Sequence, residues 1–288
     1  MNTDNKQTLG AVVISRNDGY GGDQPLKLTY CLTSLIEACD EVIYVDWNSP
    51  GWPLIDDIRG ALPHTGRLRA ITIDPALASD LTHWSLDVQL CVEVLARNIG
   101  LRRLTTDYRI STNGDIMVLD RESIVKGIVD ERTFHCIARR ETDFVEVRSQ
   151  KSEVRSQWLK ENMERFKQHG AGSPLGPKDP WSLITCPGDF QLAHQDLWRA
   201  IRGYEESLVM RGYTDSNVQR KAADAGFKLK LVRDIPAFHF QHYPGTGASG
   251  GTHNSGWNDP DTSLFDFKGT TNPETWGFSD REFPTETI

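Results

Sequence analysis

The residue best placed for ligand chemistry is Asp115, which follows a short extended stretch and a turn. Residues 108–111 are typical of a strand, and Asn113 and Gly114 then break it, because both tolerate unusual backbone angles. In open α/β sheets, ligands bind beyond the carboxyl ends of the strands, which is where this pattern would place Asp115. Its acidic oxygens suit a hard divalent cation that holds phosphates.

Three other side chains have chemistry that fits such a site. His239 and His242 lie three residues apart, downstream of Asp115. A lone histidine is usually structural, whereas this pair favours a metal ligand, and imidazole with carboxylate and phosphate oxygens would suit manganese better than calcium. Arg97 precedes Asp115 and has a planar fork of donors that suits ribose or phosphate.

Alternating strands and helices would position these residues. Apolar runs at 9–15, 41–46 and 68–73 are typical of strands, the first of them buried on both faces. Between them, Pro25 begins a helix with apolar residues at helical spacing, and residues 54–62 form a short second helix. Two strand–helix units in succession imply a parallel sheet with right-handed crossovers.

The rest of the chain continues this mixed pattern. We expect helices over 76–95, 121–130, 152–169 and 216–226, and strands over 133–139 and 228–232. The proline- and glycine-rich loop 170–182 marks a boundary between two halves of the domain.

Three features are compatible with both a structural and a functional role. The loop 16–23 is polar and glycine-rich, so it is either a flexible connection or a loop whose backbone approaches a nucleotide. It matches neither a P-loop nor the G-x-G-x-x-G fingerprint. Asp46 ends the second strand and either caps the next turn or accepts a hydrogen bond from uracil or ribose. Asp215 precedes the predicted helix 216–226, where aspartate is a favourable N-cap.

Composition disfavours several classes of protein. The chain has 288 residues, with ordinary hydrophobic (38%) and charged (25%) content, and its net charge of −8 disfavours a general nucleic-acid binder. No apolar run approaches the roughly 20 residues that span a bilayer. Residues 1–10 lack the apolar core of a signal peptide, so we expect a cytoplasmic protein. The five cysteines form no C-x-x-C pair and are expected to be reduced and structural.

Four segments carry a pattern known from one group of enzymes. They are residues 96–118, with ARN, DY and NGDI; residues 45–49, VDWNS; residues 187–204; and residues 211–215, RGYTD. In this order they resemble the glycosyltransferases of the GT-A fold, especially the large family-two group. The chain departs from that family's pattern at two positions. Asn113 replaces the first Asp of the Asp-x-Asp signature, and Thr214 replaces the Glu that commonly precedes the catalytic Asp.

The resemblance implies a fold and a division of the chain. The fold would be a single α/β domain of GT-A type, Rossmann-like and of the nucleotide-diphospho-sugar transferase kind, with a mostly parallel central sheet. It would cover residues 1–244, with the nucleotide-sugar bound by residues 9–120 and the acceptor by residues 121–244. Residues 245–288 would be a C-terminal extension that covers the site or the sheet.

The resemblance also assigns residues to roles. Asp115 would bind the metal with a histidine, His239 in first place and His242 in second. Asp215 would be the catalytic base. The residues expected at the nucleotide are Ser15, Arg16, Asn17, Asp46, Arg97, Asn113, Gly114 and Asp115, and those expected at the donor or acceptor sugar are Asp189, Gln191 and Thr214.

The function implied is metal-dependent transfer of a sugar from a nucleotide-sugar, a UDP-sugar, to an acceptor hydroxyl with inversion. Mn²⁺ or Mg²⁺ would be the metal, and a glycan or glycolipid precursor the acceptor, with peripheral contact to a membrane left open. One alternative is a sugar-1-phosphate nucleotidyltransferase, although Arg16 is the only basic residue of the first loop before Lys27. The second alternative is an inactive nucleotide- or sugar-binding module. The departures from the family pattern at Asn113 and Thr214 favour this alternative.

Overall fold

The first half of the chain alternates strands with helices, as its apolar runs predict. The structure is a computed structural model that describes residues 7–82, 91–150, 152–166, 188–208, 214–241 and 272–288. The elements of the first half are, in chain order, β1 (Leu9–Ser15), α1 (Gln24–Ala38), β2 (Glu41–Trp47), α2 (Leu54–Ile58), β3 (Leu68–Ile73), α3 (Pro75–Thr82), α4 (Glu93–Arg103), β4 (Tyr108–Asn113), β5 (Ile116–Val118) and α5 (Arg121–Gly127).

The second half adds strands to two sheets and helices around them. Its elements are β6 (Thr133–Ile137), β7 (Arg140–Thr142), α6 (Phe144–Ser149), α7 (Ser152–Glu161), β8 (Phe190–His194), α9 (Gln195–Ala200), α10 (Thr214–Asp224), β9 (Lys228–Val232), β10 (Ala237–Phe240) and β11 (Thr285–Thr287). The predicted boundary loop 170–182 lies outside the described residues.

The structure corrects several predicted boundaries. Two helices, α3 and α4, replace the continuous helix predicted over 76–95, and residues 83–90 between them lie outside the described residues. Two strands replace the one predicted over 133–139, because the chain leaves the larger sheet after Ile137 and enters the smaller one as β7. Helix α7 is shorter than the helix predicted over 152–169.

The strand order places β1 at the centre of the larger sheet. Within the described residues this sheet has eight strands in the order β11-β3-β2-β1-β4-β8-β6-β9, and four of its seven pairings are parallel. The predicted α/β domain with a mostly parallel central sheet is therefore confirmed. From β1 the strand order runs one way through β2 and β3 and the other way to β4. Such a switch point opens a crevice at the carboxyl ends of the strands.

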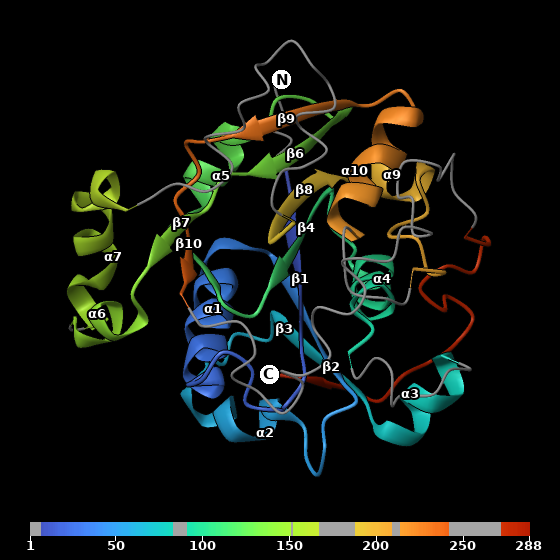
Figure 1. The fold of residues 1–288 in the computed structure, drawn as a ribbon, viewed down its shortest axis with the longest axis horizontal. Coiled ribbons are helices and arrows are strands. Elements are labelled where there is room, and N and C mark those ends of the chain that lie inside the picture. Colours follow the sequence, from blue (N-terminus) through green and yellow to red (C-terminus); the bar gives the residue numbers. More distant parts are fainter. Residues whose placement is uncertain (1–6, 83–90, 151, 167–187, 209–213, 242–271) are drawn as a thin grey trace, which may run out of the picture.

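Each face of the larger sheet has its own apolar core, and helices cover both faces (Figure 1). One core joins the sheet to α1, α2 and α5, and the other joins it to α3, α4, α9 and α10. Along β1, Ala11 and Val13 belong to the first core while Val12 and Ile14 belong to the second, as the two-residue period of a strand requires. Burial on both faces explains why this strand is a continuous apolar run.

A smaller sheet lies beside the larger one and carries α6 and α7 (Figure 1). Its strands, β5, β10 and β7, pack with these two helices through a third apolar cluster that includes Phe144, Phe238 and Phe240. Strand β5 follows β4 directly after the turn at residues 114–115, so this turn connects the two sheets. Among the described residues, no helix is both long enough and apolar enough to cross a membrane.

The last described segment, residues 272–288, packs along the larger sheet and ends at its edge. The Asn272 side chain donates hydrogen bonds to the carbonyls of Arg202 (2.7 Å) and Tyr204 (2.5 Å). Trp276 is buried in the core that contains α4, and β11 pairs antiparallel with β3. The rest of the predicted extension, residues 245–271, lies outside the described residues.

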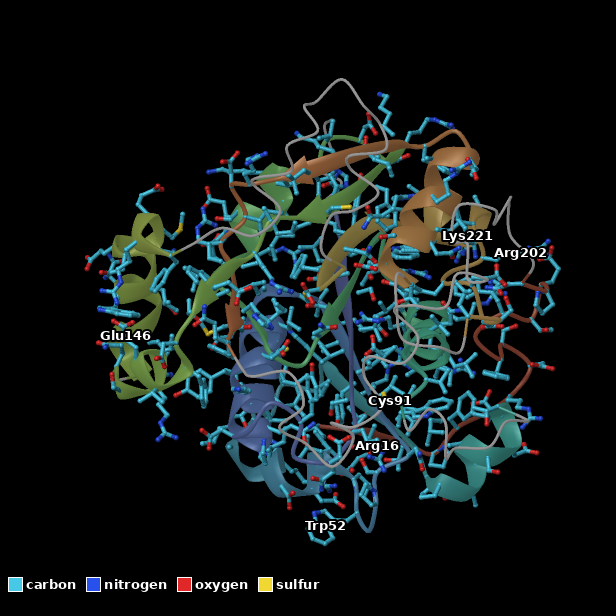
Figure 2. All side chains as sticks on the ribbon, in the orientation of Figure 1. Arg16, Trp52, Cys91, Glu146, Arg202 and Lys221 are labelled. Atoms are coloured by element: carbon cyan, nitrogen blue, oxygen red, sulfur yellow. The ribbon has the colours of Figure 1, made fainter. Side chains whose placement is uncertain are left out.

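A buried ion pair fixes α10 to the turn that follows α9. Nζ of Lys221 lies 3.4 Å from Oε2 of Glu205, and both side chains are only 1% exposed. The ammonium also donates to the carbonyl of Gly203 at 2.8 Å. Burial lowers the pKa of Lys221 to about 8 although Glu205 acts in the opposite direction. Figure 2 shows Lys221 on α10, the helix whose first turn contains Asp215.

Removing one partner of this pair should destabilise the protein. We expect Lys221→Met to lower the free energy of unfolding by about 3–5 kcal/mol, because Glu205 would then be a buried charge without its cation. The double variant Lys221→Met/Glu205→Gln should recover much of this loss. Lys228→Met, which breaks the exposed pair with Asp130, is the control and should change stability by about 1 kcal/mol or less. Denaturation in urea measures all three, and equal stability of Lys221→Met and the parent would contradict the expectation.

Candidate active site

The loops that follow β1 and β2 are tied together at the carboxyl edge of the larger sheet. Nε of Arg16 donates to the carbonyl of Asn48 at 2.8 Å, and the backbone N–H of Asn17 donates to Oγ of Ser49 at 2.7 Å. Arg16 is buried and also pairs with Asp18, whereas Asn17 is partly exposed. These contacts hold the 16–23 loop against the loop that follows β2 and engage the guanidinium of Arg16 within the protein.

Asp46 lies in the interior beneath these loops. It is 1% exposed, and its Oδ2 accepts hydrogen bonds from the hydroxyl of Tyr44 (2.8 Å) and the backbone N–H of Leu54 (2.7 Å). Burial raises the pKa of Asp46 above its ordinary value, although these hydrogen bonds act in the opposite direction. Tyr44 in turn shares a 2.7 Å hydrogen bond with Ser15. Of the two roles predicted for Asp46, the hydrogen bond from Leu54, the first residue of α2, fits the structural one.

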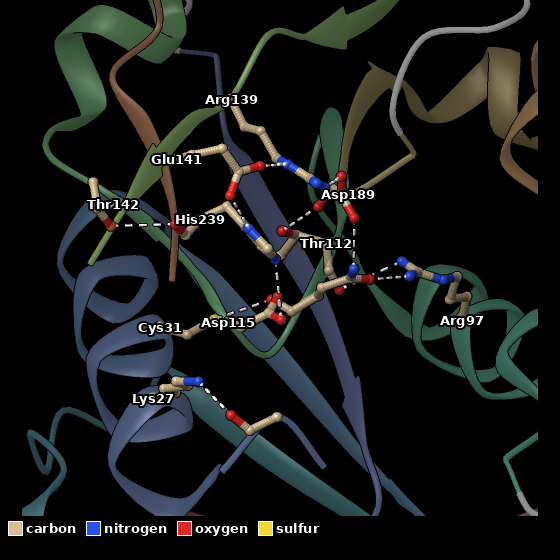
Figure 3. Close-up of polar contacts among 12 residues, drawn as sticks. Lys27, Cys31, Arg97, Thr112, Asp115, Arg139, Glu141, Thr142, Asp189 and His239 are labelled. Atoms are coloured by element: carbon tan, nitrogen blue, oxygen red, sulfur yellow. Dashed lines mark hydrogen bonds and ion pairs between the residues drawn. The ribbon is translucent and has the colours of Figure 1, made fainter. Parts of the chain in front are cut away.

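The turn between the two sheets brings Asp115 to the imidazole of His239. Nε2 of His239 lies 3.3 Å from Oδ2 of Asp115, and Nδ1 lies 2.7 Å from Oε2 of Glu141 (Figure 3). The backbone N–H of Phe240 also donates to the carbonyl of Asp115 at 3.0 Å. Burial alone would lower the pKa of His239, but Asp115 and Glu141 outweigh it and raise the pKa.

A chain of polar contacts continues from Glu141 back to the end of β4. Oε1 of Glu141 accepts from Nε of Arg139 at 2.9 Å, and Arg139 pairs with Oδ2 of Asp189. Oδ1 of Asp189 accepts from Nδ2 of Asn113 at 2.8 Å. Burial would raise the pKa of Glu141, but the hydrogen bonds and positive charges of His239 and Arg139 prevail and lower the pKa to about 2.

The other end of Asn113 contacts Arg97, which α4 holds against β4. The side-chain oxygen of Asn113 accepts from Nη2 of Arg97, while Nη1 donates to Oγ of Ser111 at 2.8 Å. Helix α4 can approach the sheet closely because it carries Gly100, where an added Cβ would lie 2.1 Å from Cγ2 of Val12. Arg97 is 4% exposed, and its guanidinium donates these hydrogen bonds inside the protein.

These contacts form what we call the polar network, drawn in Figure 3. Its members are Arg97, Asn113, Asp115, Arg139, Glu141, Asp189 and His239. The polar network gives a physical reason for asparagine at position 113, where the Asp-x-Asp signature has its first Asp. A carboxamide donates to Asp189 and accepts from Arg97 at the same time, whereas a carboxylate has no donor for Asp189.

Asp215 lies in the first turn of α10 and packs closely against Gly188. The helix begins at Thr214, so the prediction that Asp215 precedes the helix as its N-cap is wrong. Its Oδ1 accepts from the backbone N–H of Ser216 at 2.9 Å. A Cβ added to Gly188 would lie 2.0 Å from Cβ of Asp215, so glycine is required for this approach. Burial raises the pKa of Asp215 above its ordinary value although the side chain remains partly exposed.

Gln191 supports Asp215 from inside the sheet. It is fully buried, its Nε2 donates to the carbonyl of Asp215 at 3.3 Å, and its Oε1 accepts from the hydroxyl of Tyr204. The hydroxyl of Tyr204 also lies 2.9 Å from Oγ of Ser111, the residue that accepts from Arg97. The buried position of Gln191 disfavours the predicted contact with a sugar. Thr214, by contrast, is partly exposed.

Several residues near the site were not singled out from the sequence. Arg139 and Glu141 belong to no motif that the sequence analysis used, because their partners across the site, Asp189 and His239, lie far away in the chain. Lys27 had a detectable signal, since a lysine between the apolar residues of α1 is unusual. It is buried, and its Nζ donates to the carbonyl of Gly21 at 2.7 Å. Burial lowers the pKa of Lys27, and the nearby carboxylate of Asp115 acts in the opposite direction.

The donor set fits a divalent cation only if the ligand supplies the remaining oxygens. No group of three His, Cys, Asp or Glu side chains that could hold a metal occurs within the residues that the structure describes. The side chains of Asp115 and His239 nevertheless provide one oxygen and one nitrogen 3.3 Å apart. Two adjacent octahedral ligands with bonds of about 2.1 Å are separated by about 3 Å, so this spacing is suitable. The second predicted histidine, His242, lies outside the described residues.

Solved structures of glycosyltransferases have a similar fold. Residues 1–349 of TarS from S. aureus in complex with UDP match with a TM-score of 0.50 and 13% identity, over 81% of this chain and 60% of that one. GalNAc-T7 with UDP, GalNAc and Mn²⁺ matches with a TM-score of 0.51 and 13% identity, over 83% of this chain and 45% of that one. This chain therefore spans less than two thirds of either structure. The predicted resemblance to the GT-A fold is confirmed. No protein-family model and no curated protein matches the sequence.

Restoring the first Asp of the family signature should be harmful in this protein. Asn113→Asp would place a second carboxylate against Asp189 and remove the donor between them. We expect the free energy of unfolding to fall by about 1–3 kcal/mol, the usual cost of an unsatisfied buried polar group. The double variant Asn113→Asp/Asp189→Asn should regain part of the loss, because it restores a donor–acceptor pair. Chemical denaturation measures both, and unchanged stability of Asn113→Asp would show that the network contact contributes nothing.

Proposed function

We propose that the chain is a metal-dependent glycosyltransferase that moves a sugar from a UDP-sugar to an acceptor hydroxyl with inversion. The observation that carries this proposal is the approach of His239 to Asp115 at the carboxyl end of β4. It occurs at the strand edge where open α/β sheets bind ligands, in a fold whose structural neighbours are glycosyltransferases. The acceptor class, a glycan or glycolipid, and the cytoplasmic setting are parts of the proposal that rest on the sequence alone.

Donor binding would use the carboxyl edge of the larger sheet, between the 16–23 loop and the polar network. In this proposal the nucleoside lies against the 16–23 loop near Ser15 and Asn17, and the diphosphate extends toward Asp115. Lys27, whose charge lies near Asp115, would then face the phosphates. Arg16 would act beneath the nucleoside by holding the two loops together, and Asp46 would hold the loop after β2 through its contact with Leu54.

Asp115 and His239 would hold Mn²⁺ or Mg²⁺ together with diphosphate oxygens. When bound, the cation would offset the negative charge that builds up on the leaving nucleotide. The side chains themselves supply the position, because the backbone of Asp115 is hydrogen bonded to β10 and the imidazole is held by Glu141. Hard oxygen donors with one imidazole are compatible with manganese.

Asp215 would take the proton from the acceptor hydroxyl as that oxygen attacks the anomeric carbon. The residue as a whole is partly exposed, and its backbone is held by Gln191. Direct displacement by an external hydroxyl inverts the anomeric configuration. Thr214 is partly exposed beside Asp215 and remains a candidate contact for a sugar, whereas Asp189 and Gln191 would support the site from within.

The structure disfavours the nucleotidyltransferase alternative. That chemistry requires a basic side chain directed at the phosphates directly after the first strand. Arg16 donates to Asn48 and pairs with Asp18 instead. An inactive binding module differs from the proposed enzyme in one measurable respect, since it would bind UDP and show no turnover.

The metal site can be tested with two substitutions. Calorimetric titration with UDP, with and without Mn²⁺, should show that Asp115→Ala and His239→Ala lose the increase in affinity that the metal provides in the parent. The loss should exceed about 10–100-fold, which is typical of removing only an outer-shell partner. His64→Ala, on an exposed surface, is the control. Retention of the full metal effect by Asp115→Ala would place the metal elsewhere, and a loss in His242→Ala alone would assign the imidazole to His242.

The base can be tested by its effect on turnover. Asp215→Asn should lower turnover by about 10²–10⁴-fold while UDP affinity stays within a few-fold, because proton abstraction matters in the transition state. Asp224→Asn, exposed at the other end of α10, is the matched control.

The pH profile of the parent provides a second measure of the same residue. Asp215 must be ionised to accept a proton, and its pKa is raised above 3.8, so activity should fall with decreasing pH at a higher pH than an exposed aspartate would give. Normal turnover of Asp215→Asn would exclude this residue as the base.

A further inference from the structure

Glu141 stands behind His239, on the side of the imidazole ring away from Asp115. Glu141 and His239 are paired residues of the adjacent parallel strands β7 and β10. Oε2 of Glu141 lies 2.7 Å from Nδ1, whereas Asp115 lies 3.3 Å from Nε2 (Figure 3). The two carboxylates therefore contact opposite nitrogens of one ring.

We propose that Glu141 is a positioning residue that presents Nε2 of His239 to the divalent cation at Asp115. This inference rests on the proposed function. An ionised carboxylate can only accept a hydrogen bond, so the contact at 2.7 Å requires a proton on Nδ1. With the proton held at Nδ1, the neutral imidazole has its lone pair on Nε2, the nitrogen that faces Asp115.

The position of Glu141 is itself fixed by the rest of the polar network. Its second oxygen accepts from Nε of Arg139 at 2.9 Å, and the side chain is 8% exposed. Arg139 also pairs with Asp189, the residue before β8, and Asp189 contacts Asn113 on β4. With both oxygens engaged and little solvent access, the carboxylate has one orientation, and the ring of His239 is aligned with it.

The same geometry shows that Glu141 is not a metal ligand. A cation between Asp115 and Nε2 would have the imidazole ring between itself and Glu141. The residue would therefore act through His239, by fixing the tautomer and the ring plane. Such carboxylate partners of metal-bound histidines typically contribute about 10–100-fold to metal affinity.

The test compares Mn²⁺ affinity among variants by electron paramagnetic resonance of the unbound ion, at one pH and with saturating UDP. Glu141→Ala should weaken Mn²⁺ binding by about 10–100-fold. Glu141→Gln should lose less, because its amide oxygen still accepts from Nδ1. The control Glu161→Ala removes an exposed carboxylate of α7 and should bind Mn²⁺ as the parent does.

The UDP affinity without metal separates positioning from a general structural effect. It should be the same in the parent and in both Glu141 variants. Parental Mn²⁺ affinity in Glu141→Ala would overturn the inference, and so would equal loss of metal-free UDP binding in both variants. If Glu141→Ala does not fold, Glu141→Gln decides the question in the presence of UDP. A modest loss of Mn²⁺ affinity in this variant supports the inference, and an affinity equal to or above that of the parent would overturn the inference. A parent that binds no Mn²⁺ with UDP would instead refute the proposed metal site itself.

Discussion

The turn at residues 114–115 is the constraint on which the candidate site depends. It connects β4 of the larger sheet to β5 of the smaller one, so the position of Asp115 is determined by both sheets at once. The hydrogen bond from Phe240 to the carbonyl of Asp115 fixes the turn to β10. Because β10 also carries His239, the same backbone pairing brings the imidazole to the carboxylate. A small shift of either sheet would separate the two groups.

Charge balance favours asparagine at position 113, where the Asp-x-Asp signature has its first Asp. Asp189 and Glu141 are partly or largely buried carboxylates, and Arg139 lies between them. A further carboxylate at position 113 would face Asp189 without a cation of its own on that side. The carboxamide of Asn113 joins Asp189 to Arg97 with no added charge. The departure from Asp-x-Asp is thus compatible with a functional site, because the position serves as an internal connection in this protein.

Local sequence patterns were sufficient for the first strand–helix units and for the turn at Asp115, but not for the contacts that surround that turn. The apolar run of β1 and the turn residues before Asp115 are local signals, and each predicted its element correctly. The pair Glu141–His239 joins residues 98 positions apart, and periodicity contains no information about such contacts. Asp46 is a second residue whose contacts could not be predicted from the sequence. Its position at a strand end favours a ligand contact, whereas only the three-dimensional structure shows that the side chain is buried and that its Oδ2 accepts from Tyr44 and Leu54.

The proposed binding of a divalent cation and a nucleotide diphosphate at the Asp115–His239 edge can be observed by anomalous diffraction at the manganese edge, from crystals of the protein with UDP and Mn²⁺. We expect one strong peak bonded to Oδ of Asp115 and Nε2 of His239, with diphosphate oxygens completing the shell and the nucleoside against the 16–23 loop. A peak remote from Asp115, or UDP bound in the crevice with no metal at this edge, would contradict it.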